Sequence, residues 1–180
     1  AAFRRLFAAQ LVGLLGFGLT TVALGLLAFD LAGGNAGEVL GIALGLKMAT
    51  YVMVSPVGAT LAANVSRKKL LVGLDLLRAL AVVSIVFVDQ VWQVYVLIVL
   101  LSAGAAGFTP ALQAVIPDIF EDVDEYTEAL SLSRLTYELE GLLSPVFAAL
   151  LLGLVSFSAL FAVNAAAFLV SAMIISTTAI

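Results

Sequence analysis

The sequence predicts an all-α integral membrane protein that forms one domain of six transmembrane helices over residues 1–180. Composition is the first reason: hydrophobic residues make up 63% of the chain and charged residues 11%, whereas soluble domains average about 45–50% and about 25%. The spacing of the polar breaks is the second, since a transmembrane helix needs about 20 apolar residues. The apolar runs predict helices over residues 6–29, 39–62, 70–88, 91–114, 129–153 and 158–176.

The residue types that are missing restrict the chemistry of this chain. It contains no Cys and no His, which removes thiol nucleophiles, imidazole bases and the usual zinc ligands. We therefore predict that the protein is not an enzyme and uses neither a metal nor a cofactor. Its net charge is −4, and no basic stripe is present that would bind the phosphates of a nucleic acid.

The first two predicted helices are separated by a turn-like, glycine-containing segment over residues 30–35. The second helix carries Lys47 near its middle, where a charge costs about 2.5–3.5 kcal/mol unless it finds a partner or water. Lys47 is therefore predicted to face the interior of the helix bundle. The alternative is that it snorkels from a tilted helix toward the membrane surface.

The third predicted helix carries Asp75 and Arg78, three positions apart, which places both side chains on one helix face. We predict a structural ion pair between them, with a role in gating as the alternative. Only Asp89 and Gln90 separate this helix from the next, so the two should form an antiparallel hairpin. Pro110 should bend or break the fourth helix.

Residues 117–128 form the most acidic segment of the chain. Their carboxylates do not follow the EF-hand pattern with its central glycine, so we predict a solvent-exposed loop and no metal site. This loop is expected to be attracted to Arg67, Lys68 and Lys69, which lie in another predicted loop over residues 63–69.

The fifth predicted helix is the most charged. Arg134 and Glu138 share one helix face, and we predict a structural ion pair between them. Glu140 has no cation on its own face, and a carboxyl buried without a partner readily holds a proton, so Glu140 is the better candidate for carrying one. In the sixth helix, Asn164 is predicted to form a hydrogen bond to another helix.

The distribution of cations predicts the orientation in the membrane. Lys and Arg beside transmembrane helices are retained on the cytoplasmic side, which assigns Arg67, Lys68 and Lys69 to the cytoplasm. Alternating the helices then brings Arg4 and Arg5 to the same side, and leaves no Lys or Arg in any predicted outer loop. Both termini and the loops over residues 63–69 and 117–128 are therefore predicted to be cytoplasmic.

The loop over residues 63–69 and the helix before it resemble the signature of the Major Facilitator Superfamily, Gly-x-Leu-Ala-Asp-Arg-x-Gly-Arg-Arg-x-Leu. The matching positions are Leu61, Ala62, Arg67, Lys68 and Leu70. The first glycine of the signature falls on Ala59, next to Gly58, and its acid falls on Ala63. The acid that family members use in gating is therefore missing here.

Other segments are similar to the bacterial drug-efflux group of this superfamily, which includes macrolide exporters: residues 3–7, 75–78, 114–118 and 164–168. Residues 144–149 resemble the antiporter signature Gly-Pro-x-x-Gly-Gly, with small residues in place of the glycines. The resemblance implies the N-terminal six-helix half of a major facilitator fold, built as a 3+3 inverted repeat. The Ser-Pro-Val triplet at residues 55–57, which recurs at 144–146, also fits such a repeat.

The resemblance also implies a function: a secondary active transporter domain in the bacterial cytoplasmic membrane that exports small amphipathic molecules by proton antiport. The candidates for proton coupling or gating are Glu138, Glu140, Asp75, Arg78, Lys47 and Arg134. The signature-loop candidates are Gly58, Leu61, Ala62, Arg67 and Lys68. The helix-bend and antiporter-like candidates are Pro56, Pro110, Ser144, Pro145, Ala148 and Ala149.

The expected partners are the lipid bilayer, a small-molecule substrate and a second six-helix half, supplied by the same chain in a full-length protein or by a homodimer. No nucleic acid is expected. Two alternatives remain at this point. One is a membrane scaffold or assembly subunit without transport, which the missing signature acid favours, and the other is a fragment that is inactive without its C-terminal half.

Overall fold

The computed structural model describes residues 2–120, 122–152 and 156–178. Within these ranges the chain is helical and contains no strand, which confirms the all-α class. The elements are α1 (Ala2–Ala32), η1 (Gly33–Asn35), α2 (Ala36–Asn64), α3 (Arg67–Ser84), η2 (Ile85–Phe87), α4 (Val91–Ile119), α5 (Val123–Leu152) and α6 (Phe157–Thr177), where η denotes a 3₁₀-helix.

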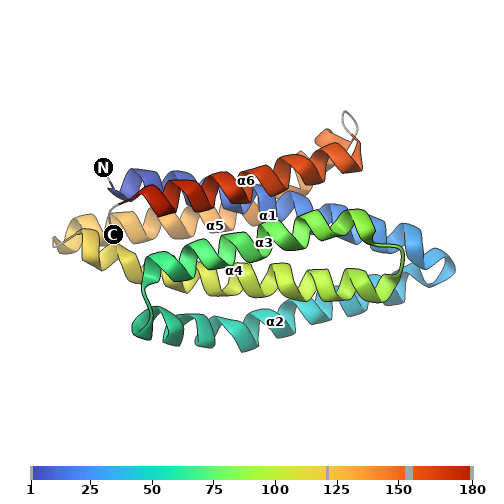
Figure 1. The fold of residues 1–180 in the computed structure, drawn as a ribbon, viewed down its shortest axis with the longest axis horizontal. Coiled ribbons are helices and arrows are strands. Elements are labelled where there is room, and N and C mark those ends of the chain that lie inside the picture. The colour runs from blue at the N-terminus through green and yellow to red at the C-terminus, as the bar shows by residue number, and fades with distance from the viewer. Residues whose placement is uncertain (1, 121, 153–155, 179–180) are drawn as a thin grey trace.

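Four of the described stretches are long and apolar enough to cross a membrane: Ala2–Asn64, Arg67–Phe87, Val91–Ile119 and Ser158–Thr177. The first of them holds two helices, because α1 and α2 fold back on each other at η1 (Figure 1). Gly33 in this turn has a φ of 56°, a conformation that favours glycine. A transmembrane course for α5 is not among the four and stays a prediction.

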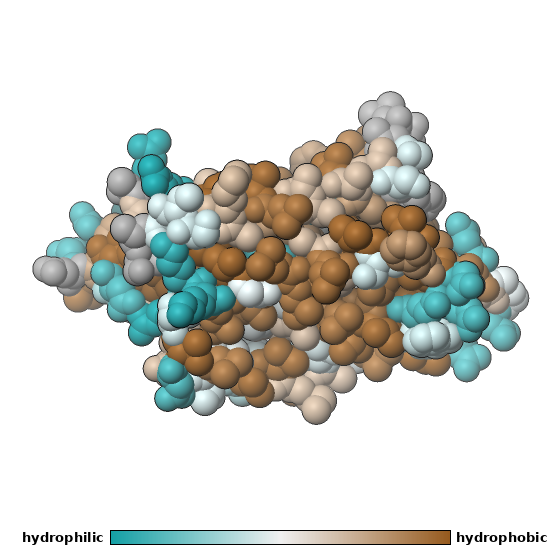
Figure 2. Space-filling view, viewed as in Figure 1, coloured by the Kyte–Doolittle hydropathy of each residue, from teal (hydrophilic) through white to brown (hydrophobic). Residues whose placement is uncertain are grey.

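The helices lie side by side and alternate in direction (Figure 1). The α1 helix contacts α2, α4, α5 and α6, while α3 packs against α4 and α6. Both labelled chain ends lie at the same end of the bundle as the α2–α3 and α4–α5 connections. Figure 2 shows hydrophilic residues at the two ends of this face and a broad hydrophobic zone between them. This distribution suits a protein that crosses a bilayer along its long axis.

The α2 and α4 helices cross at two glycines. A Cβ atom added to Gly58 would lie only 2.7 Å from the Cα atom of Gly107, so the two backbones approach each other as small residues permit in membranes. This contact places the C-terminal end of α2, and the signature loop that follows it, against α4.

The sequence predicts that Pro110 bends or breaks this helix; α4 does not break there, and a bend stays a prediction. The helix continues through Pro110 and Pro117 to Ile119. Leu112 and Val115 in this final part are buried in the core, and packing against neighbouring helices offsets the backbone hydrogen bond that a proline removes. Pro56 likewise lies inside the continuous α2 helix.

Both predicted loops are shorter than expected, because most of the acidic segment over residues 117–128 and most of residues 63–69 are helical. Asp122 Oδ1 accepts hydrogen bonds from the backbone N–H groups of Asp124 at 2.9 Å and Glu125 at 3.1 Å. Asp122 thereby caps the start of α5, and acidic side chains in a first turn interact favourably with the helix dipole. The acids that suggested a loop therefore begin a helix.

Candidate functional site

The polar residues of the bundle interior fall into two groups, and a third group lies at one end. We call them the central cluster (Lys47, Tyr51, Tyr137, Glu140 and Ser144), the buried ion pair (Asp75, Arg78 and Ser171) and the signature loop (residues 61–68). The central cluster joins α2 to α5 across the face of α1, and the buried ion pair joins α3 to α6.

In the central cluster, Glu140 lies against both α1 and α2. The hydroxyl of Ser144 donates a hydrogen bond of 2.9 Å to Glu140 Oε1, and Lys47 attracts the same carboxylate from α2. The Lys47 Nζ atom also lies 5.4 Å from the centre of the Phe17 ring. Glu140 was expected to have no cation on its own helix face, and Lys47 acts on it electrostatically from another helix, which a reading of one helix face could not find.

Gly18 of α1 makes this arrangement possible. A Cβ atom at this position would overlap the side chains of Ser144 and Glu140. Because glycine leaves that space open, the Glu140 side chain can lie across the backbone of α1. The three helices thus share one carboxylate.

Tyr51 and Tyr137 complete the central cluster. The Tyr51 hydroxyl interacts with that of Tyr137, and Tyr51 also interacts electrostatically with Glu140 and Arg78. Neither tyrosine was selected from the sequence. The signal that could have found them is helical spacing, since Tyr51 follows Lys47 by four positions and Tyr137 precedes Glu140 by three.

A cavity of about 150 Å³ adjoins the central cluster between α1 and α5. Its lining consists of Leu11, Leu14, Leu15, Thr136, Leu139, Glu140 and Leu143. Glu140 is the one charged residue of this otherwise largely apolar lining. The leucines can contact an apolar group, while the Glu140 carboxyl group beside them can bind either a cation or a proton.

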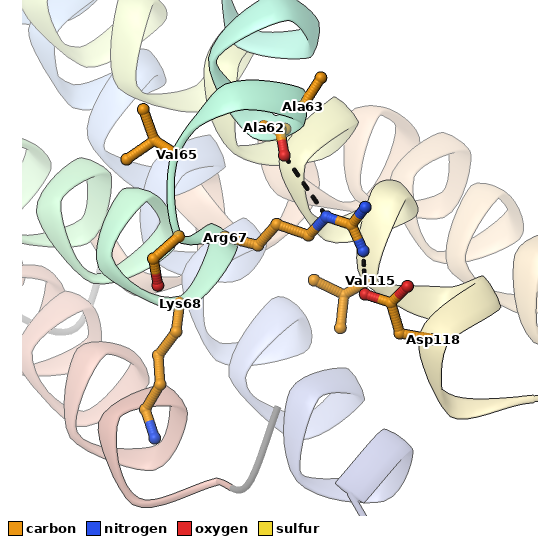
Figure 3. Close-up of a pocket in the computed structure, with 8 residues that line it drawn as sticks. Ala62, Ala63, Val65, Arg67, Lys68, Val115 and Asp118 are labelled. Atoms are coloured by element: carbon orange, nitrogen blue, oxygen red, sulfur yellow. Dashed lines mark hydrogen bonds and ion pairs between the residues drawn. The ribbon is translucent and has the colours of Figure 1, made fainter.

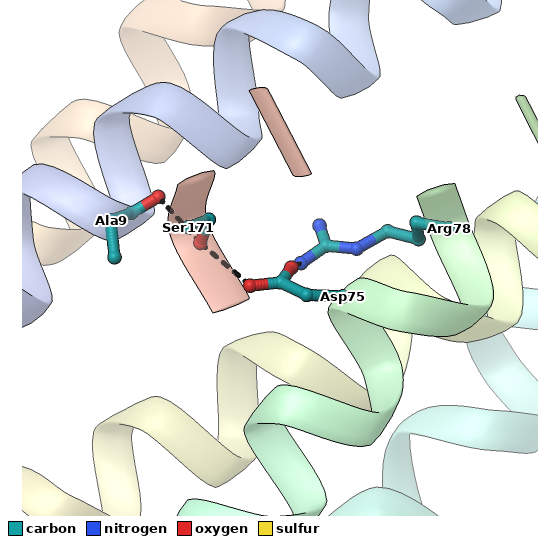
Figure 4. Close-up of polar contacts among 4 residues, drawn as sticks. All are labelled: Ala9, Asp75, Arg78 and Ser171. Carbon is teal, nitrogen blue, oxygen red and sulfur yellow. Dashed lines mark hydrogen bonds and ion pairs between the residues drawn. The ribbon is translucent and has the colours of Figure 1, made fainter. Parts of the chain in front are cut away.

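The ion pair predicted for Asp75 and Arg78 is present, and it is deeply buried. The exposed fractions of the two side chains are 0% and 2%. Ser171 Oγ lies 2.6 Å from Asp75 Oδ2 and 3.2 Å from the Ala9 carbonyl oxygen, with one proton to donate between them (Figure 4). A buried pair is tolerated when further hydrogen bonds satisfy its remaining atoms, and Ser171 supplies one.

Two aromatic rings enclose the Arg78 guanidinium. Its central carbon lies 4.5 Å from the centre of the Phe108 ring on α4 and 4.8 Å from that of Phe168 on α6. Both distances are within the range of cation–π contacts. Through Ser171, Ala9 and these rings, one ion pair on α3 contacts α1, α4 and α6.

The signature loop connects α2 to α4 and α6. Arg67 pairs with Asp118 at the end of α4, and its Nε atom donates a hydrogen bond of 3.4 Å to the Ala62 carbonyl (Figure 3). Lys68 Nζ donates a 2.7 Å hydrogen bond to the carbonyl of Thr178, after the last residue of α6. The expected attraction between the cationic loop and the acidic segment is confirmed by the Arg67–Asp118 pair, which stands beside a cavity of about 290 Å³.

Other candidates are not part of these groups. Arg134 and Glu138 are exposed on α5, and among the described residues the ion pairs are Arg67–Asp118 and Asp75–Arg78. The predicted Arg134–Glu138 pair is therefore not formed, because no packing holds two exposed, flexible side chains in one geometry. Leu61 is exposed. The side chains of Pro145, Ala148 and Ala149 lie outside the described part of the structure.

The hydrogen bond predicted for Asn164 is confirmed. Its Nδ2 atom donates to Thr20 Oγ1 of α1 over 2.9 Å. A second polar contact on α1 joins it to α5, where Gln10 Nε2 donates to the Ser133 carbonyl at 3.0 Å and Ser133 Oγ donates to Gln10 Oε1 at 2.9 Å. Together these bonds attach α5 and α6 to the central helix.

The family model of the Major Facilitator Superfamily matches residues 6–178. The chain belongs to the Major Facilitator Superfamily. It is 31% identical to the uncharacterised MFS-type transporter YfiS of Bacillus subtilis over 124 residues, which cover 69% of this chain and 30% of that protein.

Similarity extends to drug-efflux members of the superfamily. The chain is 29% identical to macrolide efflux protein A of Streptococcus pyogenes over 135 residues, which cover 72% of this chain and 33% of the relative. For the protein of the same name in Enterococcus faecalis, the identity is 29% over 119 residues, which cover 63% of this chain and 36% of the relative. The chain thus spans about a third of the length of these relatives.

Proposed function

We propose that this chain is the transport domain of a secondary active exporter that moves small amphipathic molecules in exchange for protons. The observation that carries the proposal is the position of Glu140. This carboxylate lies in an apolar part of the bundle, beside a largely leucine-lined cavity and within electrostatic reach of Lys47. Ionisable groups inside a transmembrane bundle commonly mark substrate and proton pathways.

The composition of the cavity favours an amphipathic substrate. Five leucines supply apolar surface, and Thr136 and Glu140 supply the polar contacts. An apolar ring or chain could pack against the leucines while a basic nitrogen approaches the carboxylate, which is how small-molecule sites combine affinity with orientation. That macrolide efflux proteins are among the relatives supports the same class of substrate.

The contacts of Glu140 also favour exchange with a proton. The charged carboxylate accepts the Ser144 hydrogen bond and attracts Lys47. A proton on Glu140 removes that attraction, so that Lys47 and the α2 helix are held less tightly against α5. Protonation and substrate binding would then compete for one group, which is the requirement for antiport.

The complete transporter needs a second six-helix half. The outer faces of α2 and α5 expose apolar side chains, including Val52 at 76% and Leu142 at 72%. Lipid can cover part of this surface and a second six-helix half can cover the rest. Alternating access would then arise as one half rocks against the other. The bilayer is a bacterial cytoplasmic membrane, with both termini cytoplasmic.

Export of a fluorescent cationic dye from membrane vesicles tests the proposal. Vesicles contain the chain alone or together with a second six-helix half, and export is measured with and without an uncoupler. We expect Glu140→Gln to reduce export to the rate that the unsubstituted chain shows in the presence of the uncoupler, because glutamine cannot exchange a proton. The matched control is Glu138→Gln on the exposed face of α5, which should retain gradient-dependent export.

Each result has a defined meaning. If Glu140→Gln exports dye as the unsubstituted chain does, Glu140 is not the proton carrier. If no combination of halves exports dye, a scaffold or assembly subunit becomes the better interpretation, as the missing acid at Ala63 of the signature also suggests.

A further inference from the structure

One buried polar atom in the described part of the chain has no hydrogen-bond partner. Among the described residues, Arg78 Nε is the buried side-chain nitrogen or oxygen that makes no hydrogen bond. The same guanidinium pairs with Asp75 through Nη2. Leaving a buried donor unsatisfied costs about 1–3 kcal/mol, and more for a charged group, so such an atom calls for an acceptor.

Arg78 also lines a very small cavity at the centre of the bundle. The cavity, of about 10 Å³, is bordered by Gln10, Gly13, Leu14, Arg78, Ala105, Phe108, Thr109, Leu112 and Tyr137. Its polar lining residues besides Arg78 are Gln10, Thr109 and Tyr137. A single water requires about 10–15 Å³ and two to four polar partners, so the cavity has room for a water molecule and not for a transported substrate.

The hydrogen bonds already made decide which of these groups are available. Gln10 uses its amide nitrogen and oxygen in two bonds with Ser133. Thr109 and Tyr137 keep hydroxyl oxygens that can accept or donate. Arg78 Nε needs an acceptor, and a water can accept from it while donating to the two hydroxyl groups.

We propose that this cavity binds one water molecule between Arg78, Thr109 and Tyr137, and that the water joins the buried ion pair to the central cluster. The path runs from Asp75 through Arg78 and the water to Tyr137 and Tyr51, and Tyr51 interacts electrostatically with Glu140. Tyr137 is then a positioning residue for the proton exchange at Glu140. That second role rests on the proposed function, whereas the water site does not.

The surroundings of Glu140 show how such a role would act. Lys47 and Tyr51 face it from α2, and Ser144 lies on its own helix. The nearest part of α1 is Gly18, which bears no titratable group. Arg78 acts on Tyr51 electrostatically, and Tyr137 adds a second route, through hydrogen bonds, by which the buried ion pair can influence the hydroxyl of Tyr51 and, through it, the carboxyl group.

Infrared difference spectroscopy tests the water site directly. The chain is purified into lipid nanodiscs, and spectra are recorded in ordinary water and in water labelled with oxygen-18. We expect an isotope-sensitive O–H stretch from a weakly bonded internal water. Tyr137→Phe should lose it, because the phenyl ring removes one of the three partners, and Thr109→Val should lose or displace it.

The matched control is Tyr126→Phe, which removes a hydroxyl from the first turn of the same helix, away from the cavity, and should retain the band. Circular dichroism verifies that every variant stays helical. An isotope-sensitive band that is equal in the unsubstituted chain and in both cavity variants would overturn the proposal, as would its absence from the unsubstituted chain.

The role in coupling is tested by the pH dependence of dye export. Tyr137→Phe should move the pH of half-maximal export with little change in the KM for dye, whereas Tyr126→Phe should leave both unchanged. Glu140→Gln should keep the water band while losing gradient-dependent export. A water band without any export would thus refute the proposed function alone, and coupled export without the band would refute the water site alone.

Discussion

At the scale of single residues, the buried ion pair shows how a costly group becomes part of the core. Removing two charges from water is expensive, and their attraction compensates only when the remaining atoms are also satisfied. Asp75 meets this condition through Ser171, whereas Arg78 pairs with Asp75 and lies between the rings of Phe108 and Phe168 but keeps its Nε without a hydrogen bond. The pair therefore holds its helices together only while both charges are present.

Removal of one partner should be much more harmful than removal of both. Arg78→Met leaves Asp75 buried without its cation, and we expect a loss of about 3–5 kcal/mol in the free energy of unfolding. The double variant Asp75→Asn, Arg78→Met buries no charge and should recover part of that loss. Thermal unfolding of the detergent-solubilised proteins measures both, and a double variant that is no more stable than the single one would contradict this account.

At the scale of helices, the crossing of α2 and α4 depends on the absence of side chains. The nearest atom to a Cβ on Gly58 belongs to the backbone of Gly107, and a backbone atom cannot move aside as a flexible side chain can. The crossing also supports the signature loop, because α2 ends at Asn64 and Arg67 reaches Asp118 on α4. Spacing between the helices and the geometry of the loop are therefore linked.

Gly58→Ala should force α2 and α4 apart. Overpacking of this kind costs about 1–3 kcal/mol, and a displaced loop should also weaken the Arg67–Asp118 pair. The control is Gly41→Ala on the same helix, where an added Cβ has no atom within 4 Å and alanine is the better helix former. If unfolding temperatures fall equally in both variants, the glycine crossing is not the cause.

At the scale of the whole molecule, the bundle has two distinct ends and an apolar middle. Both chain termini and the signature loop lie at one end (Figure 1), where Arg67 and Lys68 make contacts with α4 and α6. As a general rule, cations beside transmembrane helices favour the cytoplasmic side, while acids contribute little, and we propose on this ground that this end is cytoplasmic. The assignment of this end to the cytoplasm therefore rests on the distribution of cations and not on the fold.

Neutralising the cations should therefore disturb orientation more than neutralising the acids. Replacing Arg67, Lys68 and Lys69 by serine is expected to raise the fraction of inverted molecules, although Arg4 and Arg5 still favour the original side. Replacing Asp122, Asp124 and Glu125 by serine should leave orientation unchanged. Accessibility of tags at each terminus to a membrane-impermeant reagent reports the result, and equal inversion in both variants would refute the assignment.

The sequence by itself determined the properties that depend on neighbours along the chain. Composition and run length predicted the all-α class, because apolar length is sufficient to mark a membrane helix. Spacing by three predicted the Asp75–Arg78 pair, since both residues occupy one face of one helix. The signature around Arg67 predicted the family, which the match over residues 6–178 confirms.

Only the tertiary structure decided which residues meet across helices. Lys47 approaches Glu140 from a helix distant in sequence, and no spacing along one helix reports such a contact. The continuation of α4 through Pro110 follows from burial among neighbouring helices, which outweighs the local preference of proline. The unpaired Nε of Arg78 and its small cavity likewise exist because several helices pack around one point, a property that no local stretch of sequence contains.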